Sequence, residues 1–215
     1  PKPGIGNTLR MRLGYLTPKF YGFQGFGEFE GLWAMQEDYN SLRNNNVGHH
    51  VIADPEKAEL NRLWLSYTGI PDTVIKGGRQ RIKIDDDRYI GNVGWRQLEQ
   101  TYDSVLVTNA SIPNLTLMAG YIGKVKTIIS TTDSMETPFA HFDYKIDGLG
   151  DSIGYGYWID YTDDPTKFKN SSQTYGIRFI GSPKVDDTFT PHYLTEWAQQ
   201  EDLGTNPIGD DVNRW

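Results

Sequence analysis

The chain has 215 residues, of which 37% are hydrophobic and 13% aromatic, and its formal net charge at pH 7 is −7. This acidic charge argues against a nucleic-acid partner. The absence of cysteine excludes a disulfide framework or a Cys-ligated zinc site, and no run of 18 apolar residues could form a membrane helix. A barrel wall needs only every second side chain to be apolar, with aromatic residues added at two interfaces, so the composition favours a transmembrane β-barrel.

Ten segments are predicted to be strands, because apolar and polar residues alternate along them with a period of two. In the first, 8–16, Arg10 and Arg12 stand between apolar residues. The clearest is 139–147, in which the even positions are apolar and the odd positions include His141, Asp143 and Lys145. The others are 21–33, 59–68, 73–84, 99–109, 115–126, 153–161, 173–180 and 188–199. We expect the apolar faces to point outward, with the side chains of Phe142, Tyr144, Ile146, Tyr155, Tyr157 and Ile177 among them.

The connections between these strands alternate in length. Short ones containing Pro or Gly lie at 17–20, 69–72, 111–114, 148–151 and 181–187, and long ones at 34–57, 85–98, 130–138, 162–172 and from 200 onward. Outer-membrane barrels have short turns on the periplasmic side and long loops outside. The pattern therefore predicts an all-β fold: an antiparallel transmembrane β-barrel with about ten strands in this chain. Residues 1–215 would form a single outer-membrane domain, incomplete at one or both ends and compatible with part of a larger barrel.

The polar faces of the predicted strands carry an excess of cations. They are Arg10, Arg12, Arg62, Arg79, Arg81, Lys83, Lys124, Lys126, Lys145 and Arg178, against the anions Glu28, Glu30, Asp143, Asp147, Asp160 and Glu196. Arg79, Arg81 and Lys83 share one predicted strand face. Because a cation-lined pore concentrates anions, we expect Arg10, Arg12, Glu28, Arg62, Arg79, Arg81, Lys83, Lys124, Lys126, Asp143, Lys145 and Arg178 to line a pore and contact its solute. The alternative is that these charges pair with one another and only keep the interior hydrated.

Residues 78–104, GRQRIKIDDDRYIGNVGWRQLEQTYDS, resemble the alginate-export family of outer-membrane porins, and residues 60–73 and 9–30 are similar to its preceding strands. Arg79 and Arg81 match the family's GRQR strand, and Asp85 or Asp86 matches the acidic pair that follows. RYIGNVGWRQ departs from the alginate exporter and is similar to a branch found in aquatic bacteria. The resemblance implies an Arg-lined barrel in the bacterial outer membrane that contacts lipids and passes anionic solutes or acidic polysaccharides. It also implies that this chain is partial, since the family's barrel has more than ten strands.

Other features give weaker indications of function. His49 and His50 lack a spaced third ligand, the run Asp85 to Asp87 lacks the spacing of a calcium loop, and His141, Asp143 and Ser152 have no nucleophile motif around them. We therefore predict no catalytic residue, no metal site and no cofactor. The leading hypothesis is a channel, and the alternatives are a soluble all-β carbohydrate-binding module or an outer-membrane barrel enzyme.

Overall fold

The computed structural model describes residues 1–161, 167, 170–184, 186–203 and 212–214. These residues form eleven β-strands. The strands are β1 (Ile5–Leu16), β2 (Phe23–Asp38), β3 (Lys57–Tyr67), β4 (Thr73–Gln80), β5 (Thr101–Ile112), β6 (Leu115–Lys126), β7 (Thr132–Ile146), β8 (Gly150–Ile159), β9 (Ser172–Gly181), β10 (Tyr193–Asp202) and β11 (Val212–Arg214). We find no helical segment in this part of the chain with both the length and the hydropathy of a membrane span.

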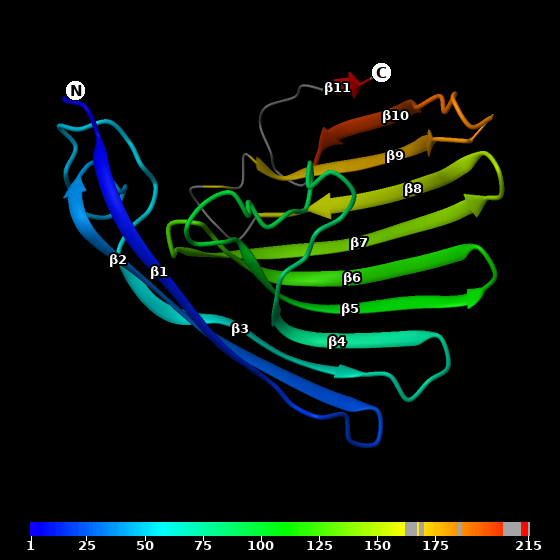
Figure 1. The fold of residues 1–215 in the computed structure, drawn as a ribbon, viewed down its shortest axis with the longest axis horizontal. Coiled ribbons are helices and arrows are strands. Elements are labelled where there is room, and N and C mark those ends of the chain that lie inside the picture. The colour runs from blue at the N-terminus through cyan, green and yellow to red at the C-terminus, as the bar shows by residue number, and fades with distance from the viewer. Residues whose placement is uncertain (162–166, 168–169, 185, 204–211, 215) are drawn as a thin grey trace. The chain divides into compact units, whose positions relative to one another are not determined.

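The strands form one sheet in which spatial order follows chain order from β1 to β11 (Figure 1). The pairs β1–β2, β7–β8, β8–β9, β9–β10 and β10–β11 are antiparallel. This up-and-down order is the expected result of joining successive alternating segments by tight turns. The predicted all-β antiparallel fold is confirmed, and each of the ten predicted strands is present.

Two compact units make up the chain. The first unit comprises Pro1–Ser66, Gly77–Ser104 and Lys124–Asp133, and the second comprises Tyr67–Lys76, Val105–Gly123 and Ser134–Trp215.

In the first unit, the period-two pattern of β1 and β2 gives the hairpin one apolar and one charged face. The register pairs Arg12 with Glu30 and Leu13 with Phe29, so charged residues face charged residues and apolar residues face apolar ones. The apolar face is exposed, Leu13 by 73% and Phe29 by 64%, whereas Glu30 is only 2% exposed. The usual order of a soluble protein is thus inverted, with large apolar side chains outside and charged ones inside.

In the second unit, β7 follows the predicted alternation but β8 does not. Phe142 pairs with Gly154 and Asp143 with Ile153, which places the glycines of β8 on the apolar face. The prediction that Tyr155 and Tyr157 point outward is therefore wrong: both are buried on the opposite face. The physical reason is that aromatic rings from elsewhere occupy the space above the glycines, since an added Cβ at Gly154 would lie 2.1 Å from the Phe142 ring.

Several predicted boundaries also differ from the structure. β4 ends at Gln80 rather than at 84, β2 continues to Asp38, and β7 already begins at Thr132, so the predicted loop 130–138 is wrong. The connections alternate between short and long from β1 to β6, but 127–131 is short where a long one was predicted, and 182–192 is long where a short one was predicted. The predicted loop 162–172 lies largely outside the described residues.

Candidate functional site

The site is a cluster of charged side chains in the first unit, where the segment 81–100 between β4 and β5 lies against β1. Arg10 of β1 donates through Nη1 to the backbone oxygens of Arg96 (3.4 Å) and Gln97. Leu98 is fully buried, and the backbone N–H of Gln97 donates to Asp54 Oδ1 at 3.3 Å. These contacts hold the segment close to the charged face of β1.

Glu99 is the centre of this cluster. Arg81 donates to both of its carboxylate oxygens, through Nε at 2.6 Å and Nη2 at 2.8 Å. Asn61 of β3 and Asn92 donate at 2.8 and 2.9 Å, and Arg12 Nη1 lies 3.3 Å away. Glu99 is only 2% exposed, so the carboxylate depends on these donors for its solvation.

The electrostatics of Glu99 follow from this geometry. Burial alone would raise the pKa of Glu99, but hydrogen bonds from Arg81, Asn61 and Asn92 and the charge of Arg12 outweigh it and lower the pKa to about 2. The hydrogen bonds to Glu99 also raise the pKa of Arg81 above its ordinary value. Both groups are therefore charged at neutral pH.

The predicted row of Arg79, Arg81 and Lys83 on one strand face is wrong, because β4 ends at Gln80 and only Arg79 belongs to it. Each of the three has a carboxylate of its own. Arg79 binds Asp103 with two hydrogen bonds of 2.7 and 2.9 Å, Arg81 binds Glu99, and Lys83 Nζ lies 3.0 Å from Asp87. The mutual repulsion expected of an uncompensated row is thus neutralised locally.

Other cations of the predicted set are paired as well. Arg62 donates to both oxygens of Glu28, at 3.0 and 2.6 Å, and Lys126 Nζ lies 2.7 Å from Glu59. In the second unit, Arg178 donates to Glu196 Oε1 at 3.0 Å, and the Tyr155 hydroxyl donates to the same oxygen at 2.6 Å. The partly buried Asp143 lies on the same face of the sheet as Arg178, since both pair with Ile153.

Lys124 and Lys145 differ from these residues. Both are exposed, and neither forms an ion pair with another described residue. The expectation of a generally cation-lined wall is therefore not supported, because most of its arginines are neutralised by nearby carboxylates. Whether the twelve predicted residues line a pore stays a prediction.

A cavity of about 450 Å³ nevertheless retains an excess of positive charge. Its charged lining consists of the cations Arg10, Arg12, Arg81 and Lys83 and the anions Asp87 and Glu99. Asn92 and Trp95 complete its polar and aromatic lining, and Trp95 is 78% exposed. The lining has four cations and two carboxylates, and Glu30, which is not part of the lining, lies 2.7 Å from Arg12, so the hollow keeps a small excess of positive charge that attracts anions.

Several buried polar atoms in and beside this cluster have no hydrogen-bond partner among the described residues. Among them are Arg12 Nη2, Glu30 Oε1, Asn61 Oδ1 and Oδ1 of the cavity-lining Asp87. Buried polar atoms are nearly always satisfied, so Arg12 Nη2 can still donate a hydrogen bond to a water molecule or a ligand group, and the oxygens can still accept one. The free donor of Arg12 adds to the capacity of the cluster to bind an anion.

The residues that the sequence analysis missed are carboxylates outside the predicted strand faces. Glu59, Glu99 and Asp103 neutralise Lys126, Arg81 and Arg79, yet none was recognised as part of the site. Glu99 belongs to the predicted strand 99–109, while β5 begins only at Thr101. The sequence indicates these carboxylates only indirectly: arginines that lie close together need anions nearby.

The hydrolase triad considered for His141, Asp143 and Ser152 is not formed. Ser152 pairs with Tyr144 on the apolar face, whereas His141 and Asp143 occupy the opposite face of β7. Among the described residues, no three His, Asp or Glu side chains gather in a way that could hold a metal ion.

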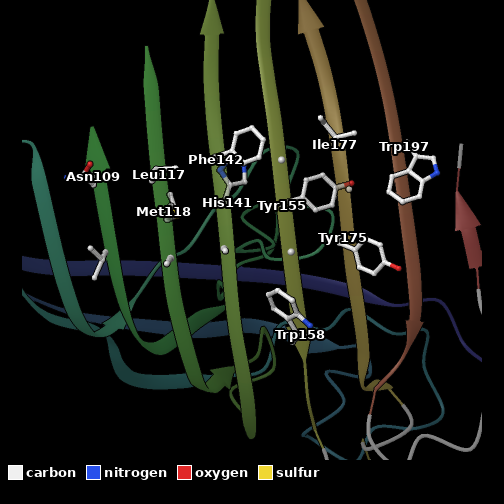
Figure 2. A pocket seen from close by; sticks show the side chains of 16 residues that line it. Asn109, Leu117, Met118, His141, Phe142, Tyr155, Trp158, Tyr175, Ile177 and Trp197 are labelled. Atoms are coloured by element: carbon white, nitrogen blue, oxygen red, sulfur yellow. The ribbon is translucent and has the colours of Figure 1, made fainter. Parts of the chain in front are cut away.

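A second hollow, of about 660 Å³, lies on the apolar face of the second unit. Figure 2 shows the side chains of Phe142, Trp158, Tyr175 and Trp197, from four neighbouring strands, around it. Its floor includes Gly154, where β8 offers no side chain. This hollow carries no charged group and belongs to the exposed apolar surface rather than to the charged cluster.

Solved structures of outer-membrane porins are similar to this chain. OpdL of Pseudomonas aeruginosa has 17% sequence identity and a TM-score of 0.63 over 98% of this chain and 52% of its own. A BenF-like porin of Pseudomonas fluorescens Pf-5 has 13% identity and a TM-score of 0.73 over 97% and 54%. OccK2 (OpdF) of Pseudomonas aeruginosa, solved in complex with glucuronate, has 15% identity and a TM-score of 0.64 over 97% and 52%.

The chain spans about half the length of these solved chains, and the likeness establishes the β-strand architecture of such porins. No protein-family model matches the chain, and neither does any curated protein.

Proposed function

We propose that the chain is part of a bacterial outer-membrane channel, a single β-barrel domain over residues 1–215, that passes small anionic solutes and acidic sugars. The observation that carries this proposal is the 450 Å³ cavity, whose charged lining has four cations and two carboxylates. Charges in a hollow with low-dielectric walls attract counter-ions more strongly than the same charges in open water. The porin-like fold supplies the setting in which such a hollow can select a passing solute.

The lining of the cavity favours an acidic sugar over a simple inorganic anion. Arginine matches a carboxylate with two parallel hydrogen bonds, and Arg12 has a donor to spare. Asn92 and Asp87 offer acceptors for hydroxyl groups, and the exposed indole of Trp95 offers a flat apolar surface for a sugar ring. The resemblance of residues 78–104 to alginate exporters and the glucuronate bound to OccK2 support the same class of solute. Alginate-like polysaccharides belong to that class.

The two alternative functions account less well for the structure. A soluble carbohydrate-binding module would leave the exposed side chains of Leu13, Tyr15 and Phe29 in water, whereas a bilayer covers them. An enzyme would need a reactive group in the site, and Ser152 lies on the opposite strand face from His141 and Asp143. A channel contacting outer-membrane lipids, without a catalytic step, is the function that the described residues support best.

The test is the reversal potential of the full-length protein in a planar bilayer under a KCl gradient. We expect anion preference in the wild type and a shift toward cations in the double variant Arg10→Gln/Lys83→Gln, which removes two cavity cations. The shift should grow at low salt, because the Debye length rises to about 30 Å at 0.01 M.

The control is Arg43→Gln, which removes an exposed cation that does not line the cavity. Glucuronate, but not glucose, should also reduce the chloride current of the wild type more than that of the double variant. An unchanged reversal potential in the double variant, or an equal shift in Arg43→Gln, would contradict the proposal.

A further inference from the structure

The two carboxylates that line the charged cavity differ in what they can still accept. Glu99 already accepts two hydrogen bonds on each oxygen, from Arg81 and Asn61 on Oε1 and from Arg81 and Asn92 on Oε2. A carboxylate oxygen has about two lone-pair sites for such bonds. Glu99 is therefore saturated, and it holds the cluster together without being able to accept a hydroxyl group of a solute.

Asp87 has one saturated side and one free side. Its Oδ2 lies 3.0 Å from Lys83 Nζ, whereas its Oδ1 is buried and has no hydrogen-bond partner among the described residues. A buried acceptor that stays unpaired costs free energy, so this oxygen favours any donor that reaches it. A hydroxyl group of a solute in the cavity is such a donor.

The backbone around Asp87 positions this carboxylate at the cavity. The N–H of Asp87 donates to the backbone oxygen of Ile84 at 3.0 Å, and φ of Asp87 is 60°. Aspartate and asparagine adopt this left-handed conformation more readily than most residues. Gly91 packs directly against Asp87, since a Cβ added at Gly91 would lie 2.4 Å from the Asp87 Cβ. The tight turn and the close approach of Gly91 thus fix the Asp87 side chain in place.

The free donors of the cavity belong to Arg12 and Lys83. Arg12 uses Nε for Glu30 at 2.7 Å and places Nη1 3.3 Å from Glu99, while its Nη2 has no partner among the described residues. Lys83 is 55% exposed at its side chain, and an ammonium group has three N–H donors. Both residues can therefore bind one carboxylate of a solute while they keep their contacts within the protein.

This combination of donors and a single free acceptor discriminates between classes of anion. A solute with a second carboxylate would bring it against Asp87, where the like charges repel each other and neither group has a proton to donate. A carboxylate without hydroxyl groups would leave Asp87 Oδ1 unpaired. A neutral sugar would give the cations no partner.

We propose that Asp87 is a specificity-determining residue: the cavity selects solutes that carry one carboxylate together with hydroxyl groups, as each ring of a uronic acid does. Arg12 and Lys83 bind the carboxylate, and Asp87 accepts a hydroxyl group. Dicarboxylates and carboxylates without hydroxyl groups are disfavoured. The inference rests on the function proposed above and narrows the class of solute for the same cavity.

The test is calorimetric titration of the full-length protein in detergent with three solutes. They are glucuronate, with one carboxylate and hydroxyl groups; glucarate, with two carboxylates and hydroxyl groups; and cyclohexanecarboxylate, with one carboxylate and no hydroxyl group. We expect the Kd of glucuronate to be about tenfold lower than that of either other solute, because an unpaired or repelled buried group weakens binding by about that factor. In Asp87→Asn the amide can donate to a second carboxylate, so the preference for glucuronate over glucarate should be lost.

The matched control is Asp85→Asn. It removes the same charge from an exposed residue that also has positive φ, 51°, but does not line the cavity. Since asparagine also adopts positive φ, both variants are compatible with the fold. Asp85→Asn should keep the wild-type ratio of the two Kd values. An unchanged ratio in Asp87→Asn, or an equal loss of preference in Asp85→Asn, would overturn the proposal.

Because calorimetry measures binding without conduction, this proposal and the channel function can fail separately. A protein that prefers glucuronate through Asp87 but shows no anion preference in a bilayer would contradict only the channel function. An anion-preferring channel that binds the three solutes equally would overturn only the role of Asp87.

Discussion

Glu99 has more partners than any other carboxylate of the cluster, and its removal should affect the fold as well as the charge. Glu99→Gln keeps the shape of the side chain but leaves Arg81 without its carboxylate partner and Arg12 with Glu30 alone. Because the carboxylate is buried while Arg81 is one-third exposed, we expect a loss of about 2–3 kcal/mol in the free energy of unfolding. Urea unfolding in detergent measures this loss. Asp103→Asn removes the partner of Arg79 from a more exposed pair and should cost less than about 1 kcal/mol. Equal losses in the two variants would contradict the central role of Glu99.

The pKa of Glu99 makes a further prediction about pH. Its value is lowered from 4.5 to about 2 in the folded protein, so the folded state binds the proton less readily than the unfolded state. The stabilisation is complete above pH 4.5 and is lost as the pH falls toward 2. Thermal midpoints measured from pH 7 to pH 2 should therefore decline more steeply in the wild type than in Glu99→Gln. Parallel curves would show that other carboxylates govern the acid sensitivity.

At the scale of the strand, alternation predicts the presence of an element better than it predicts its face. The ten strands were recognisable because the period of two is a local property of the sequence. In β8 either set of alternate positions could form the outward face: the tyrosines at 155 and 157 or the glycines at 154 and 156. Hydrophobicity favoured the tyrosines, but the neighbouring strand decided the outcome: Phe142 covers Gly154, and Tyr155 binds Glu196 on the charged face. Such cross-strand contacts depend on register, which a single strand does not reveal.

The two faces of β7, from which those of β8 follow by register, can be tested with one charged substitution on each. Phe142→Arg places a cation on the apolar face and should cost about 2–4 kcal/mol if it lies near the middle of the bilayer. Asp143→Arg, its neighbour on the opposite face, should cost clearly less, because its side chain does not meet lipid. Reversible unfolding from lipid vesicles compares the two. A larger loss for Asp143→Arg would reverse the face assignment of β7.

The site was less predictable than the fold, because its chemistry arises from partners distant in sequence. The alternation identified Arg12, Arg62 and Arg178 on charged faces, and each lies there beside a glutamate. Residues 85–98 were expected to be a loop between the ends of two strands at 84 and 99, yet the whole segment 81–100 is a connection that supplies Arg81 and Glu99 to the centre of the cluster. No periodicity marks a loop that lies against a strand face, so the cavity could not be located from the sequence.

At the scale of the whole molecule, the inverted distribution of polarity decides where the protein can reside. Leu13, Tyr15 and Phe29 are each more than 60% exposed, whereas Glu28 and Glu30 are buried. Such a surface is unfavourable in water and favourable in a bilayer. The full-length protein should therefore stay in the membrane pellet after washing with high salt and with alkaline carbonate, and should be released only by detergent. The control is a periplasmic protein of the same cells, which osmotic shock releases. Release of this protein by osmotic shock or by salt would show that another surface covers the apolar face, and the soluble carbohydrate-binding module would then be the better hypothesis.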